Sequence, residues 1–492
     1  MICNGNICLD VSSNIEIIKL SNGLKGRELN NAVANFIINI NLIGGIRLKK
    51  SIVIILCLII IFNLSACAGQ SKEGDVNSTS PTSIPGMNVK EYNDVDTSSA
   101  VATLNESKGL PIIEKYDLRQ LLEVDYINSV NEFSKQVTSL LLKGQKGNAM
   151  ISPISIQMAL SLAGVGAEGT TREEILTSLG MKDKGVDYVS EQNANMYQLL
   201  YTDNELGKLS IANSLWLKKD MVFQEDYVKR ASEDFYSSLY LVDFSDETTA
   251  TLMSKWIWEN TGKLLSPQIN LNPEQILSII NTIYFKDEWI TAFSEEATAP
   301  EEFNLIDGTK ITCDFMNMTL NNQEYVKGDN FISMALPLKN LGRMHFILPQ
   351  EGVTVDDLLQ EPDQITEVLQ KQESEYAKIL LQLPKFSFGS TFKLKEAMKA
   401  MGITSAFQTD ANFHGITEEG AAFISDIEHQ THIGIDEKGV EAAAFTNIMY
   451  AGSALLEDKK LIEMTLDRPF IFVITEEDVI LFIGIVNNPL AK

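Results

Sequence analysis

Residues 436–446 read Asp436-Glu437-Lys438-Gly439-Val440-Glu441-Ala442-Ala443-Ala444-Phe445-Thr446, an acidic lead followed by a glycine and small residues. Successive side chains of a β-strand point to opposite faces, so every second residue shares a face. One face of such a strand would be uncharged and hold Val440, Ala442, Ala444, Thr446, Ile448 and Tyr450. The other would hold Glu441, Ala443, Phe445, Asn447 and Met449. This alternation suits a strand that inserts into a sheet, and an ordinary surface loop fits the same residues equally well.

Further short motifs lie on both sides of this stretch. They are Ser152-Pro153-Ile154-Ser155-Ile156, Asn281-Thr282-Ile283-Tyr284-Phe285-Lys286-Asp287-Glu288-Trp289, Gly402-Ile403-Thr404-Ser405-Ala406-Phe407, Gly415-Ile416-Thr417-Glu418-Glu419, Arg468-Pro469-Phe470 and Gly484-Ile485-Val486-Asn487-Asn488-Pro489. Together with His429 and the stretch at residue 436, these motifs resemble those of serpins, in the same order. The resemblance covers residues 118–492.

The resemblance implies a fold and a mechanism. Serpins have an α+β fold, with helices, a large central β-sheet, further sheets and an exposed reactive-centre loop. A target protease cleaves this loop, which then inserts into the central sheet as a new strand and drags the acyl-enzyme with it. The chain would therefore be a suicide-substrate inhibitor of serine-type endopeptidases, and not an enzyme.

The resemblance also assigns roles to residues. The hinge of the loop would comprise Glu437, Gly439, Val440, Glu441, Ala442, Ala443 and Ala444. The breach, where the loop enters the sheet, and the shutter, where two strands part, would comprise Ser152, Ser155, Asn281, Trp289 and His429. Val440 stands where serpins often have Thr or Ser, and Phe445 interrupts a stretch that is usually small. Because valine is uncharged and Phe445 falls on the outward face, both departures are compatible with an inhibitor.

The reactive bond follows from the spacing of the family. Counting from Glu437 places it at Ser453-Ala454, and a small residue there suits a protease with a small or apolar specificity pocket, elastase-like or subtilisin-like. The segment before Pro469 varies in length among serpins, so Tyr450 and Leu455 remain alternatives. Two other functions also stay open. One is a non-inhibitory serpin acting as a surface binding module, and the other is an adhesin or solute-binding lipoprotein, which would have no need of the alternation.

Periodicity predicts helices early in the chain and strands later. Apolar residues recur at helical spacing between Ile127 and Leu141, and Gly144 ends the pattern. Ser152-Pro153 predicts an N-cap followed by proline at the first helical position, and the segment Thr170–Glu173 predicts a capping box. The apolar, β-rich runs that predict strands are 279–285, 331–338, 344–348, 379–388, 470–475 and 479–486.

The amino end predicts export and lipid anchoring. Basic residues precede the apolar run 52–62, and Leu64-Ser65-Ala66-Cys67 resembles the lipobox of bacterial lipoproteins, in which diacylglycerol modifies the cysteine. Residues 1–67 are therefore interpreted as a leader, of which 1–47 read as a misassigned start. Residues 68–117 are rich in Ser, Thr, Asn and Asp and predict a flexible tether, and 118–492 form the serpin domain. We expect a monomer, anchored by lipid at the bacterial cell surface or on the outer face of a membrane.

Composition excludes several other classes of function. The net charge of −26 disfavours nucleic acid as a partner. The run Gly164–Gly169 matches a dinucleotide-binding pattern, but it follows a predicted helix instead of a strand. The His429-x-x-His432 pair lacks the spacing of a zinc hydrolase, and Cys313 is interpreted as a buried inert thiol. We expect no metal and no cofactor.

Overall fold

The chain divides into two compact units, Met1–Met87 and Asn88–Lys492. The computed structural model describes residues 2–4, 7–9, 102–105, 115–340, 342–369, 374–419, 422–424, 427–440, 460–476 and 479–492. In the first unit the described residues form an antiparallel pair, β1 (Ile2–Asn4) with β2 (Ile7–Leu9). All further description concerns the second unit.

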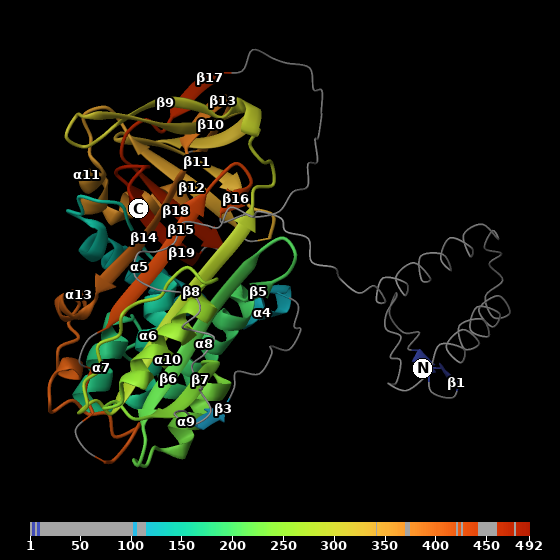
Figure 1. Cartoon of the computed structure of the whole chain (residues 1–492). Coiled ribbons are helices and arrows are strands. Elements are labelled where there is room, and N and C mark those ends of the chain that lie inside the picture. Colours follow the sequence, from blue (N-terminus) through green and yellow to red (C-terminus); the bar gives the residue numbers. More distant parts are fainter. Residues whose placement is uncertain are drawn as a thin grey trace, which may run out of the picture. The chain divides into compact units, whose positions relative to one another are not determined.

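Helices dominate the first part of this unit (Figure 1). In chain order the helices are α4 (Lys115–Leu121), α5 (Val124–Leu142), α6 (Pro153–Gly166), α7 (Gly169–Ser178), α8 (Val186–Leu200), α9 (Glu225–Glu233), α10 (Glu247–Asn260), α11 (Val355–Gln360), α12 (Pro362–Leu369) and α13 (Lys395–Ala400), with short 3-10 turns η1 (Glu295–Ala297) and η2 (Ser405–Phe407). The predicted helix at 127–141 is confirmed as part of α5, and Ser152 caps α6 as predicted, since its side chain accepts a hydrogen bond from the Ser155 nitrogen.

The predicted capping box at Thr170 is wrong. Helix α7 begins at Gly169, upstream of Thr170, and no side chain caps it. The hydroxyl of Thr171 instead accepts a hydrogen bond of 3.0 Å from the Asn412 nitrogen. The start of α7 is thus bonded to a segment that is distant in sequence, and the Thr-x-x-Glu spacing forms no cap there.

The described strands of this unit form two sheets, which together with the helices give the predicted α+β class. The central sheet has the strand order β14 (Phe386–Lys393), β15 (Glu428–Ile435), β16 (Gly439–Val440), β8 (Leu277–Glu288), β6 (Lys208–Lys218), β7 (Ser237–Val242) and β3 (Ala102–Asn105), with β5 (Thr202–Asp203) paired to β6. The second sheet has the order β17 (Leu461–Thr465), β13 (Ser374–Pro384), β10 (Lys310–Lys327), β11 (Phe331–Pro337), β12 (Arg343–Pro349), β18 (Phe470–Glu476), β19 (Val479–Val486) and β4 (Ala149–Ile151), with β9 (Ala299–Asn304) paired to β10.

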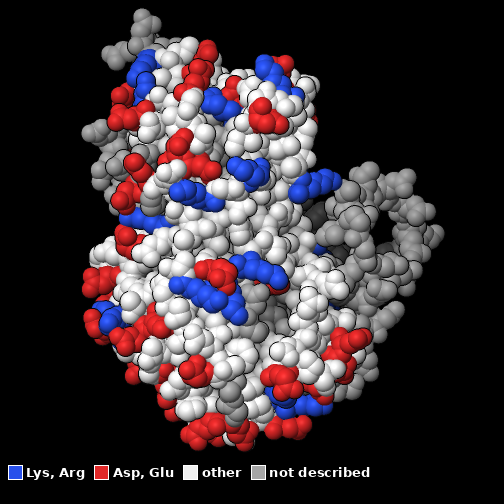
Figure 2. All heavy atoms as spheres, turned by 90° about the vertical axis from the view of Figure 1, so that its left-hand side faces the viewer, with Lys and Arg blue, Asp and Glu red and all other residues white. Residues whose placement is uncertain are grey.

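Strands β9, β10, β13 and β17 lie at one end of the unit, and helices α7 and α9 lie at the other (Figure 1). Strand β3 and the first residues of α4 fall within the segment 68–117. Among the described residues, no helix is both long and apolar enough to cross a bilayer. On the face drawn in Figure 2, acidic side chains are spread from one end to the other, and basic side chains cross the middle.

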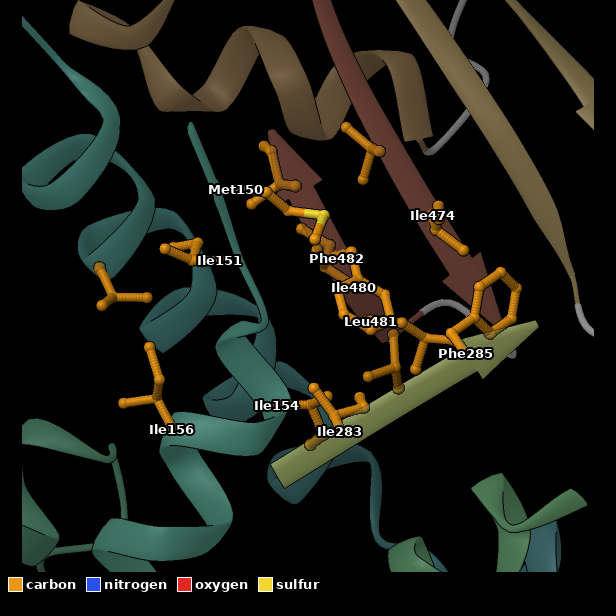
Figure 3. Close-up of a cluster of buried hydrophobic side chains, with 14 of the residues drawn as sticks. Met150, Ile151, Ile154, Ile156, Ile283, Phe285, Ile474, Ile480, Leu481 and Phe482 are labelled. Atoms are coloured by element: carbon orange, nitrogen blue, oxygen red, sulfur yellow. The ribbon is translucent and has the colours of Figure 1, made fainter. Parts of the chain in front are cut away.

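The main core lies between the two sheets and around α6. Ile283 and Phe285 of β8 point into it, toward side chains of α6 and β19, and the ring centroids of Phe285 and Phe482 are 5.9 Å apart (Figure 3). The opposite face of the central sheet packs against α10 through a smaller cluster that includes Trp216 and Trp256. One face of β8 is therefore buried in the main core. A strand paired with β8 would bury the side chains that lie on this same face of the sheet.

Candidate functional site

The hinge stretch enters the central sheet at strand β16. Val440 pairs antiparallel with Ile435 of β15 on one side and with Asp287 of β8 on the other. Strands β15 and β8 therefore run parallel to each other, with β16 between them at one end. Among the described residues, no other strand lies between them, since the remainder of β15 pairs with β14 and residues 277–286 of β8 pair with β6. The sheet thus has a position between β15 and β8 that β16 occupies only at its entrance.

A tight turn leads into β16. The Asp436 carboxylate accepts hydrogen bonds from the backbone nitrogens of Lys438 (2.8 Å) and Gly439 (3.2 Å), and the Asp436 nitrogen donates to the Gly439 oxygen (3.0 Å). Burial raises the pKa of Asp436, and the two backbone hydrogen bonds oppose that rise. The turn reverses the chain between β15 and β16, so that Gly439 and Val440 lie between β15 and β8.

Gly439 and Val440 are both buried at this entrance. A Cβ atom at position 439 would lie 2.2 Å from the Asp287 oxygen, so only glycine fits beside β8. Val440 is 1% exposed and packs in the main core together with its register partner Ile435, and its other partner, Asp287, is also buried. The alternation counted from Val440 therefore starts on the buried face. The other hinge residues, Glu441, Ala442, Ala443 and Ala444, lie outside the described residues, as do Tyr450, Ser453, Ala454, Leu455 and Cys67.

Glu437 is clamped between two segments that are distant in sequence. Its carboxylate accepts hydrogen bonds from the Thr298 hydroxyl (2.7 Å) and from the Lys385 ammonium (3.0 and 3.1 Å), and the residue is 7% exposed. Burial would raise the pKa of Glu437, but these hydrogen bonds and the charge of Lys385 lower it. The sequence alone did not reveal Thr298 and Lys385. Only the rule that a buried carboxylate needs a cation or a donor could have prompted a search for them.

Trp289 donates two hydrogen bonds to the same turn. Its indole nitrogen donates to the Asp436 oxygen (3.0 Å), and its backbone nitrogen donates to the Lys438 oxygen (2.9 Å). The ring is buried and packs edge-on against Phe293, whose nitrogen donates to the Glu437 oxygen (2.8 Å). Every carbonyl of the turn from 436 to 438 thus accepts a hydrogen bond from the segment that follows β8.

Below the entrance, polar groups from both sides of the gap meet at the start of α6. The backbone nitrogen of Ser152 donates to Nε2 of His429 on β15 (2.9 Å), and the Ser155 hydroxyl donates to the Asn281 side chain on β8. The first turn of α6 therefore bridges the two strands that flank the gap. Ser152, Ser155, Asn281 and His429, four of the five residues predicted for the breach and shutter, are thus brought together.

The polar chain extends further across the sheet than the sequence predicted. The Asn281 amide donates to Asn213 of β6 (2.7 Å), and the Asn213 amide donates to the Phe235 oxygen (2.9 Å). On the other side, the Thr431 hydroxyl of β15 donates to the Met150 oxygen (2.8 Å). Asn213 and Thr431 were missed because isolated polar residues within apolar strand patterns carry no local signal of their partners.

His429 is a neutral hydrogen-bond acceptor in this network. It is buried, and burial lowers its pKa from 6.5 to about 4. A protonated imidazole could not accept the hydrogen bond from Ser152 at Nε2. The contact between β15 and α6 therefore depends on the neutral ring.

Two other predicted features can be placed. Cys313 is buried on β10, and burial raises the pKa of its thiol to about 11, as expected for an unreactive cysteine. Gly164 and Gly166 lie in the last turn of α6 and are not preceded by a strand, so the dinucleotide-binding pattern has the wrong context. Among the residues that the structure describes, no group of three or more His, Cys, Asp and Glu side chains is placed to hold a metal ion.

The chain was compared with protein families and known structures. Residues 128–489 match the family model of serpins, serine protease inhibitors. A serpin-like protein of Methanosarcina acetivorans is 30% identical over 75% of this chain and 87% of its own length. Alpha-1-antiproteinase of Rattus norvegicus is 28% identical over 71% of this chain and 85% of its own. The native structure of the thermophilic serpin tengpin covers 79% of this chain and 100% of its own at 25% identity, with a TM-score of 0.68. The chain belongs to the serpin family.

Proposed function

We propose that this serpin is a suicide-substrate inhibitor of serine-type endopeptidases, in which the cleaved loop enters the gap between β15 and β8. The observation that carries the proposal is the position of β16. It already occupies the entrance of the gap and pairs antiparallel with both flanking strands. A relative whose name describes it as an antiproteinase adds support.

The register of Val440 predicts the neighbours of each inserted residue. Continued pairing would place Ala442 between Phe285 and Ile433, Ala444 between Ile283 and Thr431, and Thr446 between Asn281 and His429. The first two pairs of neighbours are buried on the side of the main core. Small uncharged side chains suit these positions, and Thr446 would meet the shutter with a hydroxyl group. The alternation in the sequence thus agrees with the faces of the two strands.

The proposed chemistry is that of an interrupted proteolysis. The serine of the protease attacks the carbonyl carbon of Ser453, the bond to Ala454 breaks, and Ala454 takes a proton to become a free amino end. The new bond is an ester between the protease and Ser453. Insertion of the loop then carries this acyl-enzyme away before water hydrolyses the ester. We place the reactive bond at Ser453-Ala454, with Tyr450 and Leu455 as alternatives, and the target among elastase-like or subtilisin-like enzymes.

We also propose that the protein is exported and held on the membrane by a lipid on Cys67. The lipobox-like run that ends at Cys67 supports this, and the polar segment after it would hold the inhibitor away from the bilayer. Each buried methylene of an acyl chain contributes about 0.8 kcal/mol, so two or three chains anchor a protein stably.

A panel of proteases tests the proposed function. The purified domain is mixed with subtilisin, pancreatic elastase, trypsin and chymotrypsin, and the products are separated on a denaturing gel. With subtilisin or elastase we expect a complex that is stable to denaturant. Mass spectrometry should show that the peptide released by cleavage begins at Ala454. Cleavage without any complex would favour the alternative function, a non-inhibitory serpin that serves as a surface binding module.

A further inference from the structure

Two large apolar side chains are exposed on the same face of the second sheet. Tyr376 of β13 is 58% exposed, and Leu461 of β17 is 53% exposed. The strands pair in parallel with Leu461 opposite Lys378, which places Tyr376 diagonally across from Leu461 on the same face. The other face of these strands is buried in the main core, where Ile379 and Met464 lie. We call Tyr376, Lys378 and Leu461 the β13–β17 face.

The chain returns from the reactive-centre segment at a fixed point beside this face. The ammonium group of Lys460 contacts the Tyr325 hydroxyl (2.7 Å) and the Glu375 carboxylate (2.9 Å). The Lys460 oxygen accepts a hydrogen bond of 3.0 Å from the Lys378 nitrogen. Lys460 is thus tied to β13 by both its backbone and its side chain.

Covalent length limits how far the reactive bond can lie from this point. Six peptide steps separate Ala454 from Lys460, so the bond lies at most about 22 Å from it at about 3.6 Å per step. If the bond followed Tyr450 instead, the limit would be about 32 Å. Thirteen steps separate Val440 from Ser453, which allows up to about 47 Å on the hinge side.

A protease is wider than the shorter of these tethers. A domain of about 250 residues has a radius of gyration of roughly 18 Å and is about 45 Å across. An enzyme seated on Ser453 is therefore held within reach of the surface around Lys460, whereas the longer tether leaves its distance from the hinge free. The β13–β17 face adjoins Lys460 and is the outward side of the strands there.

We propose that the β13–β17 face is a second docking surface for the body of the target protease, outside the reactive bond. It would receive an apolar patch beside the active-site cleft of the enzyme. Tyr376 and Leu461 would supply the apolar centre, because aromatic and large apolar side chains carry most interface energy. Lys378 and the exposed Glu463 would supply a polar rim. This inference rests on the proposed function, and it makes target choice depend on more than Ser453.

The test compares Tyr376→Ala and Leu461→Ala with the parent, using subtilisin and pancreatic elastase as probes. Val222→Ala is the matched control, because Val222 is 70% exposed and precedes α9 at the opposite end of the unit. The inhibition constant of the initial encounter and the limiting rate of complex formation are measured separately. Binding to an inactive protease, with its nucleophilic serine changed to alanine, is measured by surface plasmon resonance.

We expect Tyr376→Ala and Leu461→Ala each to raise the inhibition constant of the initial encounter roughly tenfold. The limiting rate of complex formation and the thermal midpoint should stay at the parent values. The Val222→Ala variant should match the parent throughout. Unchanged encounter and dissociation constants in both face variants, with covalent complex still formed, would overturn the docking surface and leave the proposed function intact. Absence of any complex between the parent and either enzyme would overturn both.

Discussion

The backbone nitrogen of Ser152 donates to Nε2 of His429 across 2.9 Å, which joins the capping residue of α6 to strand β15. Strand β15 flanks the gap that the loop is proposed to enter, and Ser155 bonds the same helix to β8 on the other side. Because His429 must stay neutral to accept the bond from Ser152, the closure of the central sheet is expected to depend on pH.

Native stability should fall as the pH drops from 6.5 toward 4. The pKa of His429 is about 4 in the folded state and 6.5 when exposed, so over this interval the unfolded chain binds more protons and the folded state loses up to about 3 kcal/mol. The check is the thermal midpoint, followed by circular dichroism at several pH values. His429→Gln, whose amide oxygen accepts without titrating, should flatten the slope. An equally steep slope in that variant would assign the effect to other groups.

Removing the cation of the hinge clamp should loosen the entrance. Lys385→Met removes the cation that pairs with the buried Glu437 carboxylate, at a cost of about 1–3 kcal/mol. The pKa of Glu437 is lowered in the folded state, so the stability of the clamp is present above pH 4.5 and is lost as the pH falls through the folded value. A double-mutant cycle with Glu437→Gln, read by thermal unfolding at pH 7, isolates the pair. Additive effects would show that the contact contributes nothing.

A charge on the inward face of the hinge should convert inhibitor into substrate. Ala444→Arg would place a guanidinium between Ile283 and Thr431, where burial of an unpaired charge costs several kcal/mol, about 3–5. Insertion would then be slower than hydrolysis of the ester, and the protease would be released active. Ala443→Arg is the matched control on the outward face and should trap protease nearly as well, as should Glu441→Arg. Efficient trapping by Ala444→Arg would refute the register derived from Val440.

Specificity should follow residue 453. Ser453→Arg is expected to create inhibition of trypsin, because the residue before the reactive bond fills the main specificity pocket. The measurement is the rate of complex formation with trypsin, compared with the parent. If the natural target cleaves only after Tyr450 or Leu455, as read by mass spectrometry of the released peptide, the assignment to Ser453 is wrong.

Membrane attachment should depend on one sulfur atom. Cys67→Ser is expected to move the protein from the membrane fraction to the soluble fraction and to abolish labelling by a fatty-acid analogue. Retention of the unlabelled variant in the membrane would favour an uncleaved signal anchor instead.

Local rules predicted the parts of the fold that depend on neighbours in sequence. The Ser152-Pro153 pair correctly predicted the start of α6, because a cap is a contact between residues three positions apart. Strands β18 and β19 were found because burial on both faces leaves continuous apolar stretches. The predicted run 379–388 was wrong as a single strand, since it spans the end of β13 and the start of β14, which belong to different sheets. The resemblance to serpins singled out Ser155, Asn281 and His429, whose contacts at the start of α6 no periodicity could have indicated.

Contacts between distant segments were beyond those rules. The clamp joins Glu437 to Thr298 and Lys385, and no pattern in any of the three segments contains the others. The same limit applies to the failed capping box, since Glu168 and Thr171 at the start of α7 both bond to the distant Asn412. It also explains β3, a strand of residues 102–105 that pairs with β7 although its composition predicted a tether.

The length of β8 limits the distance over which the proposed insertion of the loop would carry a bound protease. Continued in the register of Val440, the loop would bring Tyr450 opposite Leu277, ten steps and about 33 Å along the strand. Ser453 and the protease bound to it as an ester would then lie beyond the end of β8, and the proposed mechanism would bring the enzyme to the opposite end of the molecule. Extra loop residues would leave a longer flexible connection between the inserted strand and the ester. The protease would then be held less tightly, and its active site could return to the catalytic geometry. Insertions in the loop are thus expected to weaken trapping even where they leave the reactive bond and the hinge untouched.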